Sequence, residues 1–221
     1  MPYLREISSA ILVGGVLSVL YKMFEDRESK NDLRRLLRIH DSVDELGLTE
    51  ILPEVQGYNF TPLISDSASL SIVMNDGLRW IGNNAVNLEQ RFSNKTETIF
   101  LLVDPDSQFV KCLANKISTT EDDLGKKIRD AWQRIESAFN KSQKQGVVRI
   151  YRIRTYPNKS MFFTEKHLVE TPYQTASGRA SIPVYVYNKV ARLDAPYFFA
   201  KQDIDAMIKE ATLEREFKAG S

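Results

Sequence analysis

The chain has 221 residues, one cysteine and a formal net charge of +1. This near-neutral balance excludes a global attraction to nucleic acid or to an acidic surface. The single cysteine, Cys112, excludes a disulfide scaffold within the chain and favours a reducing compartment. The sequence holds no metal-site cluster of histidine and cysteine and no motif for a dinucleotide or a P-loop, so we expect neither a metal ion nor a cofactor.

The first element in chain order is an apolar segment over residues 7–24, which holds no acidic residue and one basic residue, Lys22. Eighteen helical residues span about 27 Å, close to the ~30 Å hydrocarbon core of a membrane. The middle of the segment lacks the polar face that a helix in a soluble core would repeat at helical spacing. The segment therefore predicts a transmembrane helix within residues 1–24. The alternatives are a helix buried by protein and a signal peptide.

The charges that flank this segment predict its orientation. Arg5 alone precedes its apolar core, and six basic residues lie at its end or after it: Lys22, Arg27, Lys30, Arg34, Arg35 and Arg38. Positive residues stay on the cytoplasmic side of a membrane helix. We therefore expect a single-pass protein of the bacterial inner membrane with its C-terminal domain in the cytoplasm.

Small residues recur along the predicted membrane helix at Ala10, Gly14 and Ser18. Such a stripe lets two helices approach closely in lipid, so the anchor is predicted to pack against a second copy. The alternative is that these positions reflect only the general abundance of small residues in membrane helices.

Residues 25–47 predict a charged stalk helix, which Gly47 ends. Residues 48–63 read as irregular because proline and glycine interrupt them. Alternating elements follow, with strands predicted at 69–74, 96–103, 147–156, 160–170 and 182–188 and helices at 80–92, 108–116, 121–144 and 203–217. This order implies one α/β domain over residues 48–217, with a mixed sheet flanked by helices, and a tail at 218–221.

Two features of this domain resemble the phospholipase D-like fold in its non-catalytic bacterial variants. A strand ends at the turn Asn75-Asp76-Gly77 before a helix, and the hydrophobic strand in TIFLLVDPDSQFV ends in an Asp-Pro-Asp-Ser turn. A long helix and the strand GVVRIYRIRTYP then follow, as in that family. The resemblance covers about residues 48–217. Together with one apolar helix and a charged stalk, it implies a membrane-tethered defence or stress protein of bacteria.

Active members of that family carry a His-x-Lys motif, in which the histidine is the nucleophile and the lysine stabilises charge. Here the matching stretch places Ser160 at the histidine position and Phe162 at the lysine position. The resemblance therefore implies a domain without phosphodiester chemistry, which senses or docks a partner. Asp104 and Asp106 form a further carboxylate pair, which we interpret as helix-capping residues, with acid–base groups as the alternative.

Basic residues near predicted strand ends suggest where a ligand binds. In an open α/β sheet, ligands bind at the carboxyl ends of the strands. The candidate anion-binding residues are Arg152, Arg154, Lys166, His167 and Arg179. If they converge, they suit the phosphate of a nucleotide or nucleic acid. The alternative is that they are solvated or paired with Glu165 and Glu170.

These features together predict a non-catalytic, membrane-anchored effector of an antiphage or stress-defence system. Its domain would sense a partner protein, a nucleoprotein, a nucleotide or a nucleic acid. Clustering of the helices in a homo-oligomer would then perturb the lipid membrane. Two alternatives stay open: a membrane-tethered phosphodiesterase using a group such as His167, and a cytoplasmic subunit whose N-terminal helix docks on a partner protein.

Overall fold

The computed structural model describes residues 17–18, 22, 32, 41–176 and 181–219. The chain divides into two compact units, residues 1–44 and residues 45–221. Most of the predicted membrane helix lies outside the described residues, as do Ala10, Gly14 and Arg179, while Ser18 is helical. Within the described residues, no helix has the length and apolar character needed to span a membrane.

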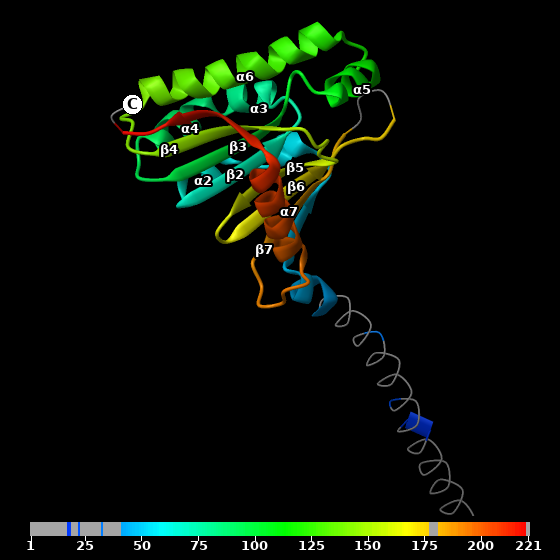
Figure 1. Cartoon of the computed structure of the whole chain (residues 1–221). Helices are drawn as coiled ribbons and strands as arrows, with labels where there is room; N and C mark the ends of the chain where they lie inside the picture. Colours follow the sequence, from blue (N-terminus) through cyan, green and yellow to red (C-terminus); the bar gives the residue numbers. More distant parts are fainter. Residues whose placement is uncertain (1–16, 19–21, 23–31, 33–40, 177–180, 220–221) are drawn as a thin grey trace, which may run out of the picture. The chain divides into compact units, whose positions relative to one another are not determined.

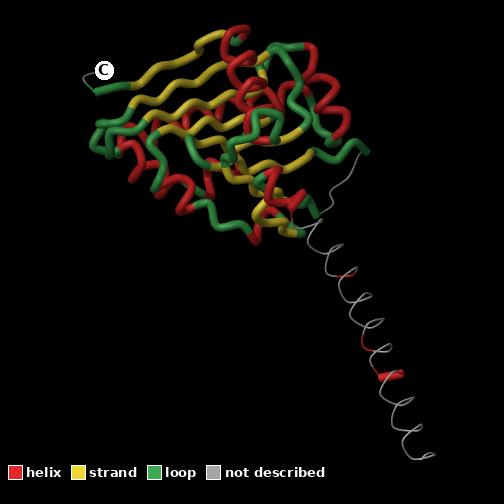
Figure 2. Tube along the Cα trace, turned by 90° about the horizontal axis from the view of Figure 1, so that it is seen from below, coloured by secondary structure: helices red, strands yellow, loops and turns green. Residues whose placement is uncertain are grey.

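The second unit is built on one eight-stranded mixed sheet (Figure 2), in the order β1-β7-β6-β5-β2-β3-β4-β8. The strands are β1 Leu48–Leu52, β2 Ser69–Met74, β3 Glu97–Val103, β4 Val147–Ile153, β5 Lys159–Thr164, β6 His167–Pro172, β7 Val184–Asn188 and β8 Thr212–Phe217. Strands β2, β3 and β4 run parallel, and every other neighbouring pair is antiparallel. The expected mixed sheet flanked by helices is confirmed.

Helices cover both faces of this sheet. They are α2 Thr61–Ser65, α3 Leu78–Asn83, α4 Ala85–Phe92, α5 Gln108–Lys116, α6 Glu121–Lys141 and α7 Pro196–Glu210, with a 3-10 turn at Val55–Gly57. Figure 1 shows α3, α4 and α6 together on one side of the strands, while α7 crosses the other side.

Alternation along β5 explains how both faces become apolar. Successive residues of a strand point to opposite sides of a sheet. The Phe162 ring contacts Trp80 of α3, with ring centroids 4.9 Å apart. The next ring, Phe163, contacts Tyr197 of α7, with centroids 4.6 Å apart. A run of consecutive apolar residues therefore marks a strand that is covered on both faces.

Several predicted elements agree with the structure. The predicted bounds of β2 and α5 coincide with those observed. Residues 41–46 are helical, and Gly47 ends this helix with a φ of 72°. The long helix α6 begins at the predicted Glu121 but ends at Lys141, because Ser142 is extended.

Other predicted boundaries are wrong. Residues 48–63 are not irregular, since they form β1, the 3-10 turn and α2. The helix predicted over 80–92 is two helices, broken at Asn84, whose side chain donates a hydrogen bond to the Trp80 carbonyl. The strand predicted over 160–170 is the hairpin of β5 and β6. The last predicted helix, over 203–217, is the end of α7 followed by strand β8.

Candidate functional site

The three parallel strands bring three chain segments together at one edge of the sheet. Residues 75–77 follow β2, residues 104–107 follow β3 and residues 154–156 follow β4. The Val103 N–H donates to the Asn75 carbonyl at 3.2 Å, and the Asp104 N–H donates to the Ile153 carbonyl at 2.8 Å. We call these three segments the carboxyl edge. It is the part of an open α/β sheet at which ligands bind.

The turn after β2 requires glycine at its third position. Gly77 has a φ of +66°, in the left-handed region that glycine adopts without steric cost. A Cβ there would lie 3.2 Å from Ile81 and 3.3 Å from Leu102. The Asp76 carboxylate accepts the Leu78 N–H at 3.0 Å. This turn leaves Asn75 buried at the carboxyl edge.

Asp104 is the central charge of this edge, and it is only 4% exposed. Its carboxylate lies 3.6 Å from Nη1 of Arg152 and 3.4 Å from Nε of Arg154. The same side chain accepts the Asp106 N–H at 3.1 Å. The edge therefore positions a buried carboxylate under two of the arginines that the sequence singles out.

Asp104 and Asp106 do not cap helix α5, so their predicted role as helix-capping residues is wrong. Helix α5 has Ser107 at its N-cap, without a side-chain capping bond. Asp104 closes the preceding turn, and Asp106 lies 2.6 Å from Arg129 of α6. The carboxylate of Asp106, the aspartate nearer to α5, pairs with the Arg129 guanidinium and not with the helix N-terminus.

The two arginines differ in availability. Arg152 Nε also lies 2.9 Å from Glu214 of β8, so acidic groups on both sides neutralise its charge. The Arg154 side chain is 84% exposed, and Asp104 is its one ion-pair partner among the described residues. Arg154 is thus the cation of this edge that a ligand can reach.

Ser160, which the resemblance noted in the sequence aligns with the histidine of phospholipase D-like enzymes, lies in a buried hydrogen-bond chain. Its hydroxyl is 2.6 Å from the Tyr173 hydroxyl, which also accepts the Asn75 N–H at 3.1 Å. Burial raises the pKa of Tyr173 to about 12, so the phenol stays neutral at physiological pH. Sequence reasoning missed Tyr173, because no motif marks a single tyrosine.

Buried polar atoms at the carboxyl edge lack hydrogen-bond partners. Among the described residues these atoms include Asn75 Oδ1, Ser107 Oγ and Arg152 Nε. Arg152 Nε lies near Glu214, but without hydrogen-bond alignment. Each unsatisfied buried group costs about 1–3 kcal/mol. A site that tolerates several has hydrogen-bonding capacity left for water or a ligand.

Two of the predicted ligand residues lie at the opposite end of the sheet. Strand β5 runs antiparallel to β2 and pairs Leu70 with Thr164, so the β5–β6 turn sits beside the start of β2. Lys166 belongs to that turn and His167 begins β6, where His167 Nδ1 lies 2.7 Å from Asn188 Oδ1. Lys166 and His167 therefore do not converge with Arg154, because β5 runs antiparallel to the strands that end at the carboxyl edge.

Glu165 and Glu170, the alternative partners for these basic residues, bind other groups in the structure. Glu165 accepts the backbone N–H groups of Ala68 and Ser69 at 3.2 and 3.3 Å. Glu170 lies 2.5 Å from Lys159. Within the part of the chain that the structure describes, no group of three or more histidine, cysteine or acidic residues is placed to hold a metal ion.

Comparison with known proteins finds similarity among solved structures. No protein-family model matches the sequence, and comparison with curated proteins finds no match. The solved structure of TrmBL2, described as an archaeal chromatin protein with a novel mode of DNA binding, is similar at a TM-score of 0.42. The two chains share 10% identity, and the alignment covers 92% of this chain and 70% of the other.

Proposed function

We propose that this chain is a non-catalytic, membrane-anchored effector of a bacterial antiphage or stress-defence system, built on a phospholipase D-like domain. The apolar segment over residues 7–24 anchors it in the inner membrane, with the domain in the cytoplasm. The domain senses a partner protein, a nucleoprotein, a nucleotide or a nucleic acid at its carboxyl edge. Assembly then gathers the membrane helices, and their cluster perturbs the lipid.

The state of Ser160 carries this proposal. A phospholipase D-type reaction needs an exposed imidazole at that position to take the phosphoryl group. Here the position holds a buried hydroxyl that is tied to Tyr173. His167 lies at the other end of the sheet, and His40 lies outside the described residues. The edge keeps the architecture of a ligand site, with Arg154 exposed over Asp104, and this supports sensing rather than phosphoryl transfer.

Reconstitution tests the membrane action. The full chain, carrying a chemically inducible dimerisation domain after Ser221, is inserted into dye-loaded liposomes. We expect dye release when the dimeriser is added. The Gly14→Ile variant should release much less, because a bulky residue keeps the helices apart. Full clustering with intact liposomes would contradict the effector function.

Two further measurements separate the alternatives. An alkaline carbonate wash should leave the full chain in the membrane pellet and free a chain that lacks residues 1–30. Release of the full chain would instead indicate a helix that docks on protein. Metal-independent phosphodiesterase activity that His167→Ala abolishes would favour the membrane-tethered enzyme.

A further inference from the structure

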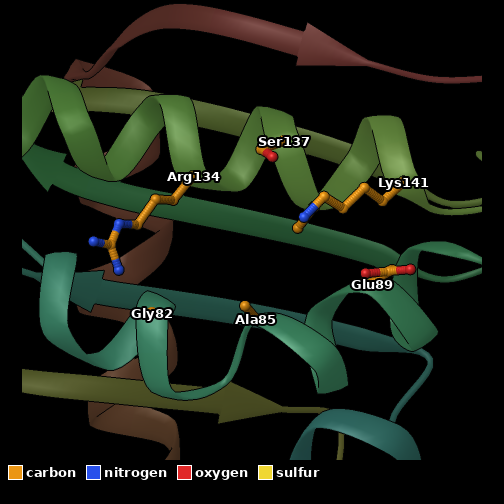
Figure 3. Close-up of a pocket in the computed structure, with 7 residues that line it drawn as sticks. Gly82, Ala85, Glu89, Arg134, Ser137 and Lys141 are labelled. Carbon is orange, nitrogen blue, oxygen red and sulfur yellow. The ribbon is translucent and has the colours of Figure 1, made fainter.

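A hollow of about 230 Å³ lies between α6 and the pair α3 and α4 (Figure 3). Small residues leave room for this hollow, and among those that line it are Gly82, Ala85 and Ala138. A Cβ at Gly82 would lie 2.2 Å from Arg134 Nη1, so the missing side chain leaves the space beside this guanidinium. Figure 3 shows Arg134 and Lys141 reaching from α6 over this hollow.

Four charged residues share the side of α6 that borders the hollow. At about 100° per residue, the following positions fall within a narrow sector of the helix: Asp123, Asp130, Arg134 and Lys141. None of the four has an ion-pair partner among the described residues. Other charged residues of α6 differ among themselves: Arg129 pairs with Asp106 and Glu136 pairs with Arg215, whereas Asp122 has no ion pair among the described residues. Asp123 in the first turn and Lys141 in the last turn also suit the helix dipole, but the charges of this stripe form no ion pair among the described residues.

The order of these charges is complementary to itself. Asp123 and Lys141 stand at equal distances along the helix on either side of Trp132, and so do Asp130 and Arg134. A second α6 that crosses antiparallel at Trp132 would place Asp123 opposite the second copy's Lys141 and Asp130 opposite its Arg134. A twofold axis forms each of these pairs twice.

We infer that this side of α6 is a docking surface for a second copy of the chain, in an antiparallel, twofold arrangement seated beside the hollow. The other basic residues near this side of α6, Lys126 and Lys127, would not lie opposite another basic residue in this antiparallel arrangement. Lys127 falls opposite Ser137 and Lys126 opposite Ala138. A nucleic acid fits less well, because no aromatic residue lines the hollow to stack on a base.

The strength of this contact depends on the membrane. Exposed ion pairs each contribute little, so four pairs give a weak dimer in free solution. Anchoring two chains in one bilayer raises their effective concentration. The inference thus rests on the proposed membrane anchoring, and it supplies a contact through which the anchors gather.

Charge reversal tests the register in the full chain, reconstituted in proteoliposomes. The exposed lone cysteine, Cys112, accepts donor and acceptor dyes, and energy transfer reports association. Asp123→Lys or Lys141→Asp alone should weaken association about tenfold, a change of about 1.4 kcal/mol. The double variant should restore it to within about twofold of the original, because the two positions are too far apart on one helix to compensate within a chain.

Asp122→Lys is the matched control. It makes the same charge change one residue away, in the same first turn of α6, but points off the stripe by about 100°. It should leave association unchanged, and thermal melts of all variants verify that they fold. Equal effects of Asp122→Lys and Asp123→Lys, or a double variant that stays dissociated, would overturn the inference.

Dye release from the same liposomes keeps this test apart from the proposed function. Association that follows the charge rule, without dye release, would support the α6 surface and contradict membrane perturbation. Dye release that persists when energy transfer no longer depends on these charges would overturn the α6 surface and leave the effector function standing.

Discussion

The two ends of the parallel strands handle buried polar groups in opposite ways. At the amino end, Arg91 of α4 is 1% exposed, and its guanidinium donates to five oxygen atoms within 3.0 Å and a sixth at 3.4 Å. At the carboxyl end, Asn75 Oδ1 and Ser107 Oγ find no partner. The buried cation of the amino end is fully hydrogen-bonded, whereas the carboxyl end combines bonded groups such as Tyr173 with two oxygen atoms that have no partner among the described residues. Unsatisfied hydrogen-bonding groups therefore distinguish the carboxyl end from the amino end.

Removal of Arg91 should have the largest effect on stability. Its partners include the carbonyls of Ile64, Ser67 and Glu97, which Arg91→Met would leave buried and unsatisfied. We expect a loss of about 3–5 kcal/mol in the free energy of unfolding, as for other broken buried charge networks. Urea denaturation measures it.

Arg79→Met on α3 is the control, since Arg79 is exposed, and it should change stability by less than about 0.5 kcal/mol. Similar losses for both variants would mean that the amino end is not held by Arg91. Burial lowers the pKa of Arg91 to about 10, which still leaves it charged at neutral pH.

Breaking the hydrogen-bond chain of Ser160, Tyr173 and Asn75 at the carboxyl end should have the next largest effect on stability. Tyr173→Phe removes the hydroxyl that accepts the Asn75 N–H and contacts Ser160. We expect a loss of about 1–3 kcal/mol, because a buried amide is left without a partner. Tyr185→Phe on β7 is the control and should be nearly neutral. An unchanged melting temperature for Tyr173→Phe would show that this end is not held by its hydrogen bonds at all.

Acid should weaken the amino end through Glu165, with a smaller effect because this carboxylate is partly exposed. Burial raises its pKa, but hydrogen bonds from backbone N–H groups and the Ser69 hydroxyl outweigh burial, so the net pKa lies below 4.5. A lowered folded-state pKa gives stability that is present above the ordinary value and is lost as pH falls through the folded value.

Stability measured from neutral pH to below that range should therefore decline less steeply in Glu165→Gln than in the original chain. If stability fell equally steeply with pH in both proteins, Glu165 would not be a source of the acid sensitivity of the amino end.

Ser107→Ala should have the smallest effect. A serine at an N-cap is ordinarily worth about 0.5–2 kcal/mol through its capping bond. Ser107 makes no such bond, and its hydroxyl is buried without a partner. We expect a change within about 0.5 kcal/mol in thermal melts, with Thr120→Ala at the capped start of α6 as the contrasting variant. A loss for Ser107→Ala equal to that for Thr120→Ala would mean that the hydroxyl has a partner in solution.

Local patterns predicted the elements whose signals are local. The alternating apolar run of β2 before Asn-Asp-Gly and the short helix α5 needed no distant partner to identify them. The hairpin of β5 and β6 was missed because its turn has no glycine, proline or asparagine. Instead, the Thr164 hydroxyl accepts the N–H groups of Lys166 and His167. Strand β8 was missed because only pairing with β4 makes its residues a strand.

The candidate site was predicted in part for the same reason. Arg152 and Arg154 follow one strand to its end, so sequence alone could place them together. Separating them from Lys166 and His167 required the direction of β5, which depends on pairing between residues almost a hundred positions apart. The link from Ser160 to Tyr173 likewise depends on β5 and β6 lying side by side.

The pairing of β1 with β7 has a consequence for synthesis. Leu48 is among the first domain residues to leave the ribosome, yet it pairs with Tyr187 near the end of the chain. Contacts so distant in sequence are slow to form. Strand β1 must therefore wait, unpaired, while nearly all of the domain is translated.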